Sequence, residues 1–166
     1  MNIKSRIILK AAGIVAAGIN KWKKTALKDQ ETIMKMLISK GRNTVFGKDH
    51  HFVDIDSYEM FRKQIPVRDY EDLRPYIDMI IDGKKNVLWP GKPKYFAKTS
   101  GTTSGVKYIP ITYDSMPNHI RTARNALLNY FHQRKNADVF DGKLIFLSGS
   151  PVLETKGGIK TGRLSG

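Results

Sequence analysis

Apolar residues in the first 40 positions recur with the period of an α-helix. Between Ile33 and Ile38 they fall at i, i+1, i+4 and i+5, which places them on one helix face. Gly41 follows as a stop signal. The pattern therefore predicts a helix over residues 3–40. A polar segment with two neighbouring histidines comes next, and we expect a loop over residues 43–54.

Two shorter helices are predicted in the following segment. Asp56 is typical of a helix N-cap, because Glu59 stands three residues later at the spacing of a capping box. This helix must end before Pro66, since a residue that precedes proline avoids the α region. A second helix is expected over residues 69–83, with acidic residues in its first turn. Pro75 predicts a break and a new helical turn there, because proline lacks the N–H of a helix interior.

The pattern then changes to short apolar runs that are typical of β-strands. Residues 95–97 and 108–111 are rich in aromatic and β-branched side chains, and each predicts a strand. Pro110 places the second strand at a sheet edge, because it cannot donate a ladder hydrogen bond. Residues 144–147, Leu-Ile-Phe-Leu, predict a further, buried strand.

A long helix is predicted between the second and third strands. Thr112 or Asp114 is expected to cap it, and its apolar stripe continues to about Arg134. Helices first, then strands alternating with a helix, indicate an α/β chain with a partial mixed sheet. We divide it into an amphipathic helical segment, residues 1–42, and an incomplete α/β domain, residues 43–166.

Composition adds a strong positive charge and removes thiol chemistry. The chain has 166 residues, 40% of them hydrophobic, and a net charge of +14 that attracts anions such as nucleotides, nucleic acid or acidic lipid. It contains no cysteine, which excludes disulfides and thiolate metal sites. The longest apolar stretch, residues 7–19, is interrupted by Lys10 and is too short to span a bilayer, so no stable membrane insertion is expected.

The strongest chemical signal is the loop between the first two predicted strands. Glycines let its backbone turn and approach a ligand, and successive N–H groups in such a turn form an anion-binding nest. It is not a Walker A loop, because three residues separate its glycines and Val106 precedes the lysine. From the residues alone, a polar hairpin turn remains an equal alternative. The candidate binders of ATP phosphates are Ser100, Gly101, Thr102, Thr103, Ser104, Gly105 and Lys107.

The loop and the three residues before it resemble the phosphate-binding signature of the adenylate-forming superfamily. Further stretches resemble one branch of it, the auxin-responsive acyl-acid amido synthetases, or GH-three family. They read NTVFGK at 43–48, IPVRDYED at 65–72 and LWPG at 88–91. The resemblance covers the chain from about residue 30 to its end. The form of the loop, TSGTTSG at 99–105, is like that of bacterial members.

This resemblance implies the N-terminal part of the large adenylate-forming α/β domain of an ATP-dependent, cytoplasmic ligase. Such an enzyme forms an acyl-adenylate from a small carboxylic acid and passes the acyl group to an amine or amino acid, with ATP and Mg²⁺. By family position, residues 100–105 contact the β and γ phosphates and Lys107 supports them. The family's Mg²⁺-placing glutamate, adenine-binding residues and C-terminal lysine are expected beyond residue 166. We therefore expect no catalytic residue or metal ligand here and an inactive isolated fragment.

Two hypotheses from other classes remain. The charge of +14 and seven tyrosines suit a basic nucleic-acid-binding module, although no nucleic-acid signature is present and the aromatic residues fall at core spacings. The loop could also merely turn a hairpin in a non-catalytic protein. His50 and His51 are adjacent and therefore point in different directions, so structural roles suit them better than metal binding. Gly157-Gly158 is either a flexible turn or the border of a pocket.

Overall fold

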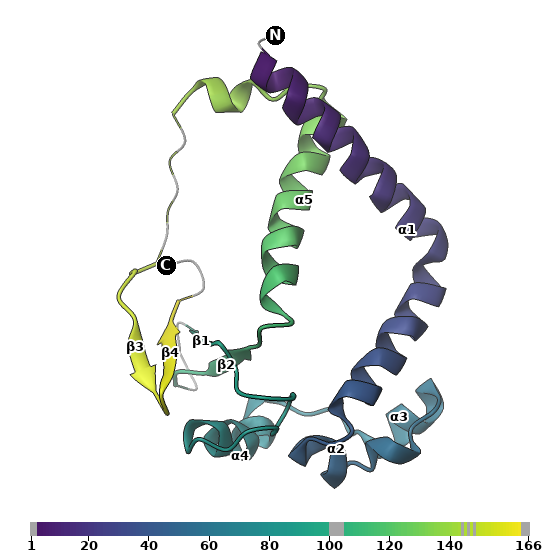
Figure 1. Cartoon of the computed structure of the whole chain (residues 1–166), viewed down its shortest axis with the longest axis vertical. Coiled ribbons are helices and arrows are strands. Elements are labelled where there is room, and N and C mark those ends of the chain that lie inside the picture. The colour runs from purple at the N-terminus through teal and green to yellow at the C-terminus, as the bar shows by residue number, and fades with distance from the viewer. Residues whose placement is uncertain (1–2, 100–104, 144, 146, 148, 164–166) are drawn as a thin grey trace. The chain divides into compact units, whose positions relative to one another are not determined.

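The computed structural model describes residues 3–99, 105–143, 145, 147 and 149–163 of the chain. Figure 1 shows its helices and strands. The helices are α1 (Ile3–Gly41), α2 (Val45–Asp49), α3 (Tyr58–Gln64), α4 (Tyr70–Ile81) and α5 (Met116–Arg134), and the strands are β1 (Tyr95–Lys98), β2 (Tyr108–Ile111), β3 (Glu154–Lys156) and β4 (Ile159–Gly162). Short 3₁₀ turns lie at Phe52–Asp54 and Asp138–Asp141. The expected α/β class, with a helical start before the strands, is confirmed.

The chain forms two compact units. The first comprises Met1–Gln30 and Asp114–Leu147, and the second comprises Glu31–Tyr113 and Ser148–Gly166. Helix α1 ends at Gly41, close to the predicted division after residue 42, but the division into two domains stays a prediction. No helix in the described ranges combines the length and the apolar character needed to cross a bilayer.

The second unit contains a mixed four-stranded sheet in the order β2-β1-β4-β3. Strand β1 pairs antiparallel with β2 and parallel with β4, and β3 pairs antiparallel with β4. The expected partial mixed sheet is therefore confirmed. Pro110 lies on β2 at the edge of the sheet, as predicted, where its missing N–H costs no ladder hydrogen bond.

Strands β3 and β4 were not predicted, and they form a hairpin around Gly157-Gly158. The backbone φ angles of these glycines are +57° and +73°, which glycine adopts at little cost. Two successive residues at positive φ between antiparallel strands make a tight hairpin turn whose twist suits the strands. A turn at this position is therefore confirmed, and its role as the border of a pocket stays a prediction.

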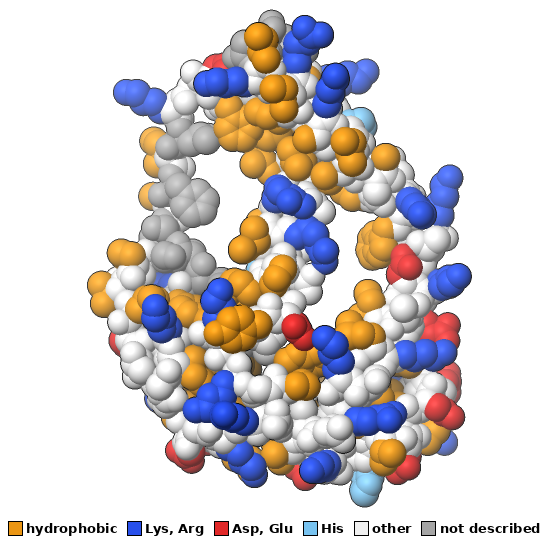
Figure 2. Space-filling view, in the orientation of Figure 1, with side chains coloured by type: hydrophobic (Ala, Val, Ile, Leu, Met, Phe, Trp, Pro, Cys, Tyr) orange, Lys and Arg blue, Asp and Glu red, His pale blue; other side chains and the backbone are white. Residues whose placement is uncertain are grey.

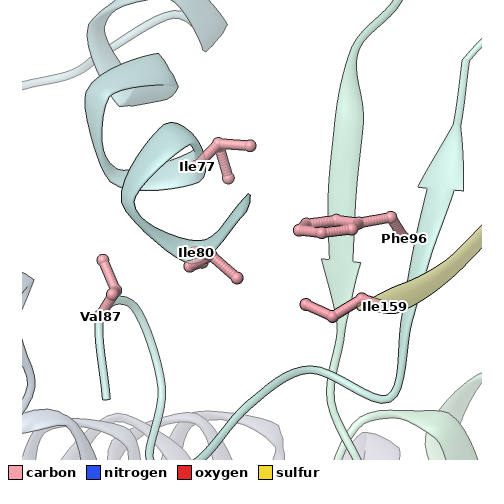
Figure 3. Packing of buried hydrophobic residues seen from close by; sticks show 5 residues of the cluster. All are labelled: Ile77, Ile80, Val87, Phe96 and Ile159. Carbon is pink, nitrogen blue, oxygen red and sulfur yellow. The ribbon is translucent and has the colours of Figure 1, made fainter. Parts of the chain in front are cut away.

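Helix α4 covers one face of the sheet and builds the core of the second unit. Ile77 and Ile80 of α4 face Phe96 of β1 and Ile159 of β4 in Figure 3, with Val87 beside them. Each of these five side chains is at most 4% exposed. The buried positions of α4 lie at helical spacing, and Phe96 and Ile159 lie on the paired strands β1 and β4, so the helix and the sheet share one core.

The polar segment predicted as a loop at 43–54 instead contains helix α2 and a 3₁₀ turn. The Thr44 hydroxyl accepts a hydrogen bond from the Gly47 backbone N–H at 3.0 Å, which caps α2. The predicted cap of the next helix was also one residue early. Ser57, not Asp56, caps α3 by accepting the N–H of Met60 at 3.3 Å. In both cases the N-cap is a hydroxyl residue, Thr44 or Ser57, that the sequence analysis did not recognise as a cap.

The break predicted at Pro75 is wrong, because α4 runs without interruption from Tyr70 to Ile81. A proline inside a helix costs about 3 kcal/mol. Two features offset that cost here. Asp69 and Asp72 form a full capping box at the start of the helix, and its apolar face is buried in the core. Tertiary packing therefore overrides the local preference of Pro75.

In the first unit, α5 packs with the start of α1 around Ala12, Phe131 and Ala137. Helix α5 begins at Met116, later than caps at Thr112 or Asp114 would place it. Pro117 stands in its first turn, where the fixed φ of proline favours a helix start.

The buried strand predicted at residues 144–147 is not found at its described positions. Ile145 and Leu147 belong to no strand and are 89% and 93% exposed, while Leu144 and Phe146 lie outside the described residues. A strand needs a neighbouring edge to receive its backbone hydrogen bonds. The edge strands of the described sheet, β2 and β3, pair with neither Ile145 nor Leu147, so the apolar run alone was an insufficient signal.

Candidate functional site

The glycine- and hydroxyl-rich loop follows β1 and leads into β2. Of the seven candidate phosphate binders, the structure describes Gly105 and Lys107, whereas residues 100–104 lie outside the described ranges. Contacts of the predicted binders Ser100, Gly101, Thr102, Thr103 and Ser104 therefore stay predictions. The described ends of the loop still define how the chain enters and leaves it.

The two ends of the loop are tied together by a pair of hydrogen bonds. The Thr99 backbone N–H donates to the carbonyl oxygen of Lys107 at 3.1 Å, and the Lys107 N–H donates to the Thr99 hydroxyl at 3.2 Å. The pairing of β1 and β2 is thereby extended one step beyond the strands. The loop therefore connects the two strands of a hairpin. Its closed base is compatible with a phosphate-binding loop and with a plain polar turn, the two hypotheses derived from the sequence.

Gly105 has the backbone conformation for which the sequence suggested a glycine. Its φ angle is +78°, in the left-handed region that other residues avoid. A Cβ atom at this position would meet nothing within 4 Å, so the backbone angle, not crowding, is what favours glycine. A left-handed residue in a turn is one of the ways in which backbone N–H groups converge on an anion.

Lys107 brings an unneutralised positive charge to the base of the loop. Its ammonium nitrogen lies 5.3 Å from the ring centroid of Tyr70, a cation–π contact. Among the ion pairs of the described residues, none includes Lys107. Lys98, in contrast, is neutralised by Glu154, whose two carboxylate oxygens lie 3.0 and 3.1 Å from its ammonium nitrogen. Because Lys107 takes part in none of these ion pairs of the described residues, its charge is available to a ligand.

Arg163 is a further cation near the loop, and the sequence did not predict its place there. Strands β1 and β4 run parallel with Ala97 opposite Gly162, so their carboxyl ends share one edge of the sheet. The loop follows β1 there, and Arg163 directly follows β4. The side chain is exposed, and its backbone carbonyl accepts the Tyr95 hydroxyl at 3.1 Å. The Gly157-Gly158 turn was the sequence signal that could have placed β4 and hence Arg163.

Two tyrosines of the second unit, Tyr95 and Tyr76, have raised pKa values because they are partly buried. Burial raises the pKa of Tyr95, whose hydroxyl holds the backbone at Arg163. Burial also raises the pKa of Tyr76 on α4, and its hydrogen bond to the Asp49 carboxylate at 3.0 Å acts in the same direction. These hydroxyls stay protonated at neutral pH and serve as structural donors.

The histidines have structural positions. His50 is buried, and its ring nitrogens lie 2.8 Å from the Phe46 carbonyl oxygen and 2.9 Å from an Arg68 guanidinium nitrogen. His51 is exposed with a φ angle of +50°. His119 and His132 are exposed on α5. Over the described residues, no three His, Asp or Glu side chains gather as metal ligands would.

The fold and the base of the loop together indicate a protein that binds an anionic ligand. A mixed sheet, covered by a helix and carrying a closed glycine-rich loop at the edge shared by two parallel strands, is an arrangement suited to anionic ligands. Comparison with known proteins gives the family. Residues 16–166 match the model of the GH3 family N-terminal domain, and the chain belongs to that family.

Curated relatives and solved structures agree with this assignment. The chain is 29% identical over 136 residues to jasmonoyl–L-amino acid synthetase JAR4 of Nicotiana attenuata, covering 80% of this chain and 23% of that protein. It is 31% identical over 93 residues to indole-3-acetic acid-amido synthetase GH3.15 of Arabidopsis thaliana, covering 55% of this chain and 16% of that protein. A structure titled GH3.15 acyl acid amido synthetase matches with a TM-score of 0.81 at 18% identity.

The share of these proteins that is covered is small. The structural match covers 93% of this chain and 28% of that chain, so the chain spans about a quarter of the length of its relatives. The fold of this region is therefore shared with GH3.15. Those relatives are plant proteins, and the bacterial-type form of the loop stays a prediction.

Proposed function

We propose that this chain forms the ATP-phosphate-binding part of an acyl-acid amido synthetase. A carboxylate oxygen attacks the α-phosphorus of ATP, the bond to the β-phosphate breaks, and an acyl-adenylate and pyrophosphate result. An amine nitrogen then attacks the acyl carbon, loses a proton and displaces AMP, giving an amide. The relatives are named for such products, jasmonoyl and indole-3-acetic acid conjugates among them.

The observation that carries the proposal is the closed loop base of a GH3-family chain. Thr99 and Lys107 tie the ends of the loop together, and Gly105 turns its backbone in the left-handed region. Attack of one anion on another needs donors and cations that are already in place. The donors are the hydroxyls and N–H groups of residues 100–105, and the cation is the Lys107 ammonium. Together they would contact the β and γ phosphates.

Mg²⁺ fits this scheme as a companion of ATP. The described residues offer no cluster of carboxylates that would hold the ion without the nucleotide. Mg²⁺ commonly keeps several waters and binds through substrate phosphates with few protein ligands. We propose that Mg²⁺ would enter with ATP, and that when bound it would offset phosphate charge.

The substrates follow from the same chemistry. A small carboxylic acid and an amine, commonly an amino acid, are the proposed partners, as the names of the relatives suggest. A cytoplasmic location, where ATP is available, is part of the proposal. The alternative of a nucleic-acid-binding module is less favoured. In the lower part of Figure 2, which holds elements of the second unit, the blue Lys and Arg side chains stand among red Asp and Glu side chains and do not form one stripe.

The proposal is tested by carboxylate-dependent exchange of labelled pyrophosphate into ATP, measured on the intact protein with a panel of small carboxylic acids. We expect exchange with at least one acid, and its loss in the Thr102→Ala/Thr103→Ala variant. Absence of exchange with every acid, combined with steeply salt-dependent DNA binding, would favour the nucleic-acid alternative.

A further inference from the structure

Tyr70, the first residue of α4, contacts the chain at Tyr108, where the chain leaves the loop. The Tyr108 backbone N–H donates a hydrogen bond to the Tyr70 hydroxyl oxygen at 2.8 Å, across 38 positions of sequence. Tyr108 begins β2, and β2 is an edge strand with β1 on its other side. On the free side of an edge strand a backbone N–H has no strand partner. The Tyr70 hydroxyl takes that place.

The neighbouring N–H is held from the opposite side. Lys107 donates its backbone N–H to the Thr99 hydroxyl at 3.2 Å, toward β1. Two successive N–H groups are thus fixed by partners on opposite sides of β2. The backbone at Lys107 and Tyr108 therefore has little freedom to rotate, and the outgoing end of the loop is fixed in direction.

The ring of Tyr70 acts on the Lys107 side chain. Its centroid lies 5.3 Å from the ammonium nitrogen, close enough for a cation–π attraction that orients the charge. A ring does not neutralise an ammonium group as a carboxylate does. The charge of Lys107 is consequently held in place while it stays available to an anion.

Tyr70 itself stands on a rigid support. Asp69 accepts the N–H groups of Glu71 and Asp72 at 2.8 and 3.1 Å, and Asp72 accepts the Asp69 N–H at 3.3 Å. This capping box fixes the first turn of α4. Ile77 and Ile80 anchor the rest of the helix to the sheet that carries the loop.

We propose that Tyr70 is a positioning residue of the phosphate loop, and this inference rests on the proposed function. Its hydroxyl fixes the outgoing end of the loop, and its ring presents the Lys107 ammonium to the β and γ phosphates. Groups that already stand in place lose less entropy when the ligand binds. Because Tyr70 acts through Lys107 and the end of the loop, its contribution should concern the β and γ phosphates, which AMP lacks.

The test measures ATP and AMP affinity by calorimetry in the intact protein, with Mg²⁺ present. Tyr70→Phe removes the hydroxyl and keeps the ring, and we expect the Kd of ATP to rise about fivefold with the Kd of AMP unchanged. Tyr70→Leu removes both contacts and should weaken ATP binding further. Combined with Lys107→Met, it should lose less than the sum of the single effects, because the two side chains act together.

The matched control is Tyr113, which follows β2 at its other end and has the Lys94 ammonium 5.6 Å from its ring centroid. Tyr113→Phe should leave ATP and AMP affinity unchanged. Equal weakening of ATP and AMP in Tyr70→Phe would assign Tyr70 a general structural role and overturn the inference. Wild-type ATP affinity in both Tyr70 variants would also overturn it, while leaving the proposed function intact. Failure of the unaltered protein to bind ATP would instead remove the proposed function, and the inference with it.

Discussion

Gly157 of the β3–β4 turn lies against the backbone of Ile81 at the end of α4. A Cβ atom on Gly157 would overlap the carbonyl oxygen of Ile81, and its φ angle of +57° already disfavours other residues. The neighbouring Gly158, at φ +73°, faces open space. The tight turn thus brings β4, and with it Arg163, into a fixed relation with α4.

Gly157→Ala should therefore destabilise the fold far more than Gly158→Ala. We expect Gly158→Ala to cost about 1 kcal/mol, the penalty of a left-handed alanine, and Gly157→Ala about 3 kcal/mol, because overlap with Ile81 adds to it. Urea unfolding followed by circular dichroism measures both. Equal losses in the two variants would show that the contact with Ile81 contributes nothing.

The raised pKa of Tyr76 should make the free energy of unfolding depend on pH in the alkaline range. Its folded-state pKa is raised above the ordinary 10.0 by burial and by the hydrogen bond to Asp49, whereas the unfolded chain has the ordinary value. The protonated phenol therefore stabilises the fold below the unfolded-state pKa, and that contribution is lost as the pH rises through the folded-state pKa.

Unfolding free energies measured at several pH values above about 9 should then fall less steeply in Tyr76→Phe than in the wild type. In Asp49→Asn the loss should be smaller and should end at a lower pH, since the carboxylate no longer helps to raise the folded-state pKa of Tyr76. An unchanged slope in Tyr76→Phe would mean that this tyrosine does not contribute to the alkaline transition.

Thr99 is predicted to matter for the loop through its hydroxyl. In Thr99→Val the Lys107 N–H loses its partner at the base of the loop, which costs about 1 kcal/mol, or about fivefold in ATP affinity. Thr99→Ser keeps the hydroxyl and should bind ATP as the wild type does. Calorimetric titration with ATP distinguishes the two, and equal weakening in both variants would argue that the hydroxyl plays no part.

Local signals in the sequence predicted much of the fold. The acidic start at 69–72, the strands on either side of the loop and the edge position of Pro110 were all predicted correctly. Each depends on a residue's own backbone preference or on a short apolar period, which single-sequence reasoning captures. The turn of the backbone at Gly105, expected from its glycine, belongs to the same group.

Features that depend on distant partners were missed. Pro75 stays inside a helix because burial of Ile77 and Ile80 against the sheet stabilises α4, and the local preference of a proline does not include that packing. Tyr70 meets Tyr108 only through the tertiary fold, 38 positions apart. Arg163 lies near the loop because β1 and β4 pair in parallel, which no local pattern in the sequence indicates. The site thus combines a local motif with cations and anchors that tertiary structure supplies.

The central claim, that residues 100–105 hold the β and γ phosphates of ATP, is tested most directly by comparing two ligands. ATP and AMP binding to the intact protein would be measured by calorimetry, in the wild type and in Thr102→Ala/Thr103→Ala. We predict that the variant binds ATP at least about tenfold more weakly, about 1.4 kcal/mol, with AMP affinity unchanged. Equal ATP affinity in the variant and the wild type would contradict the account.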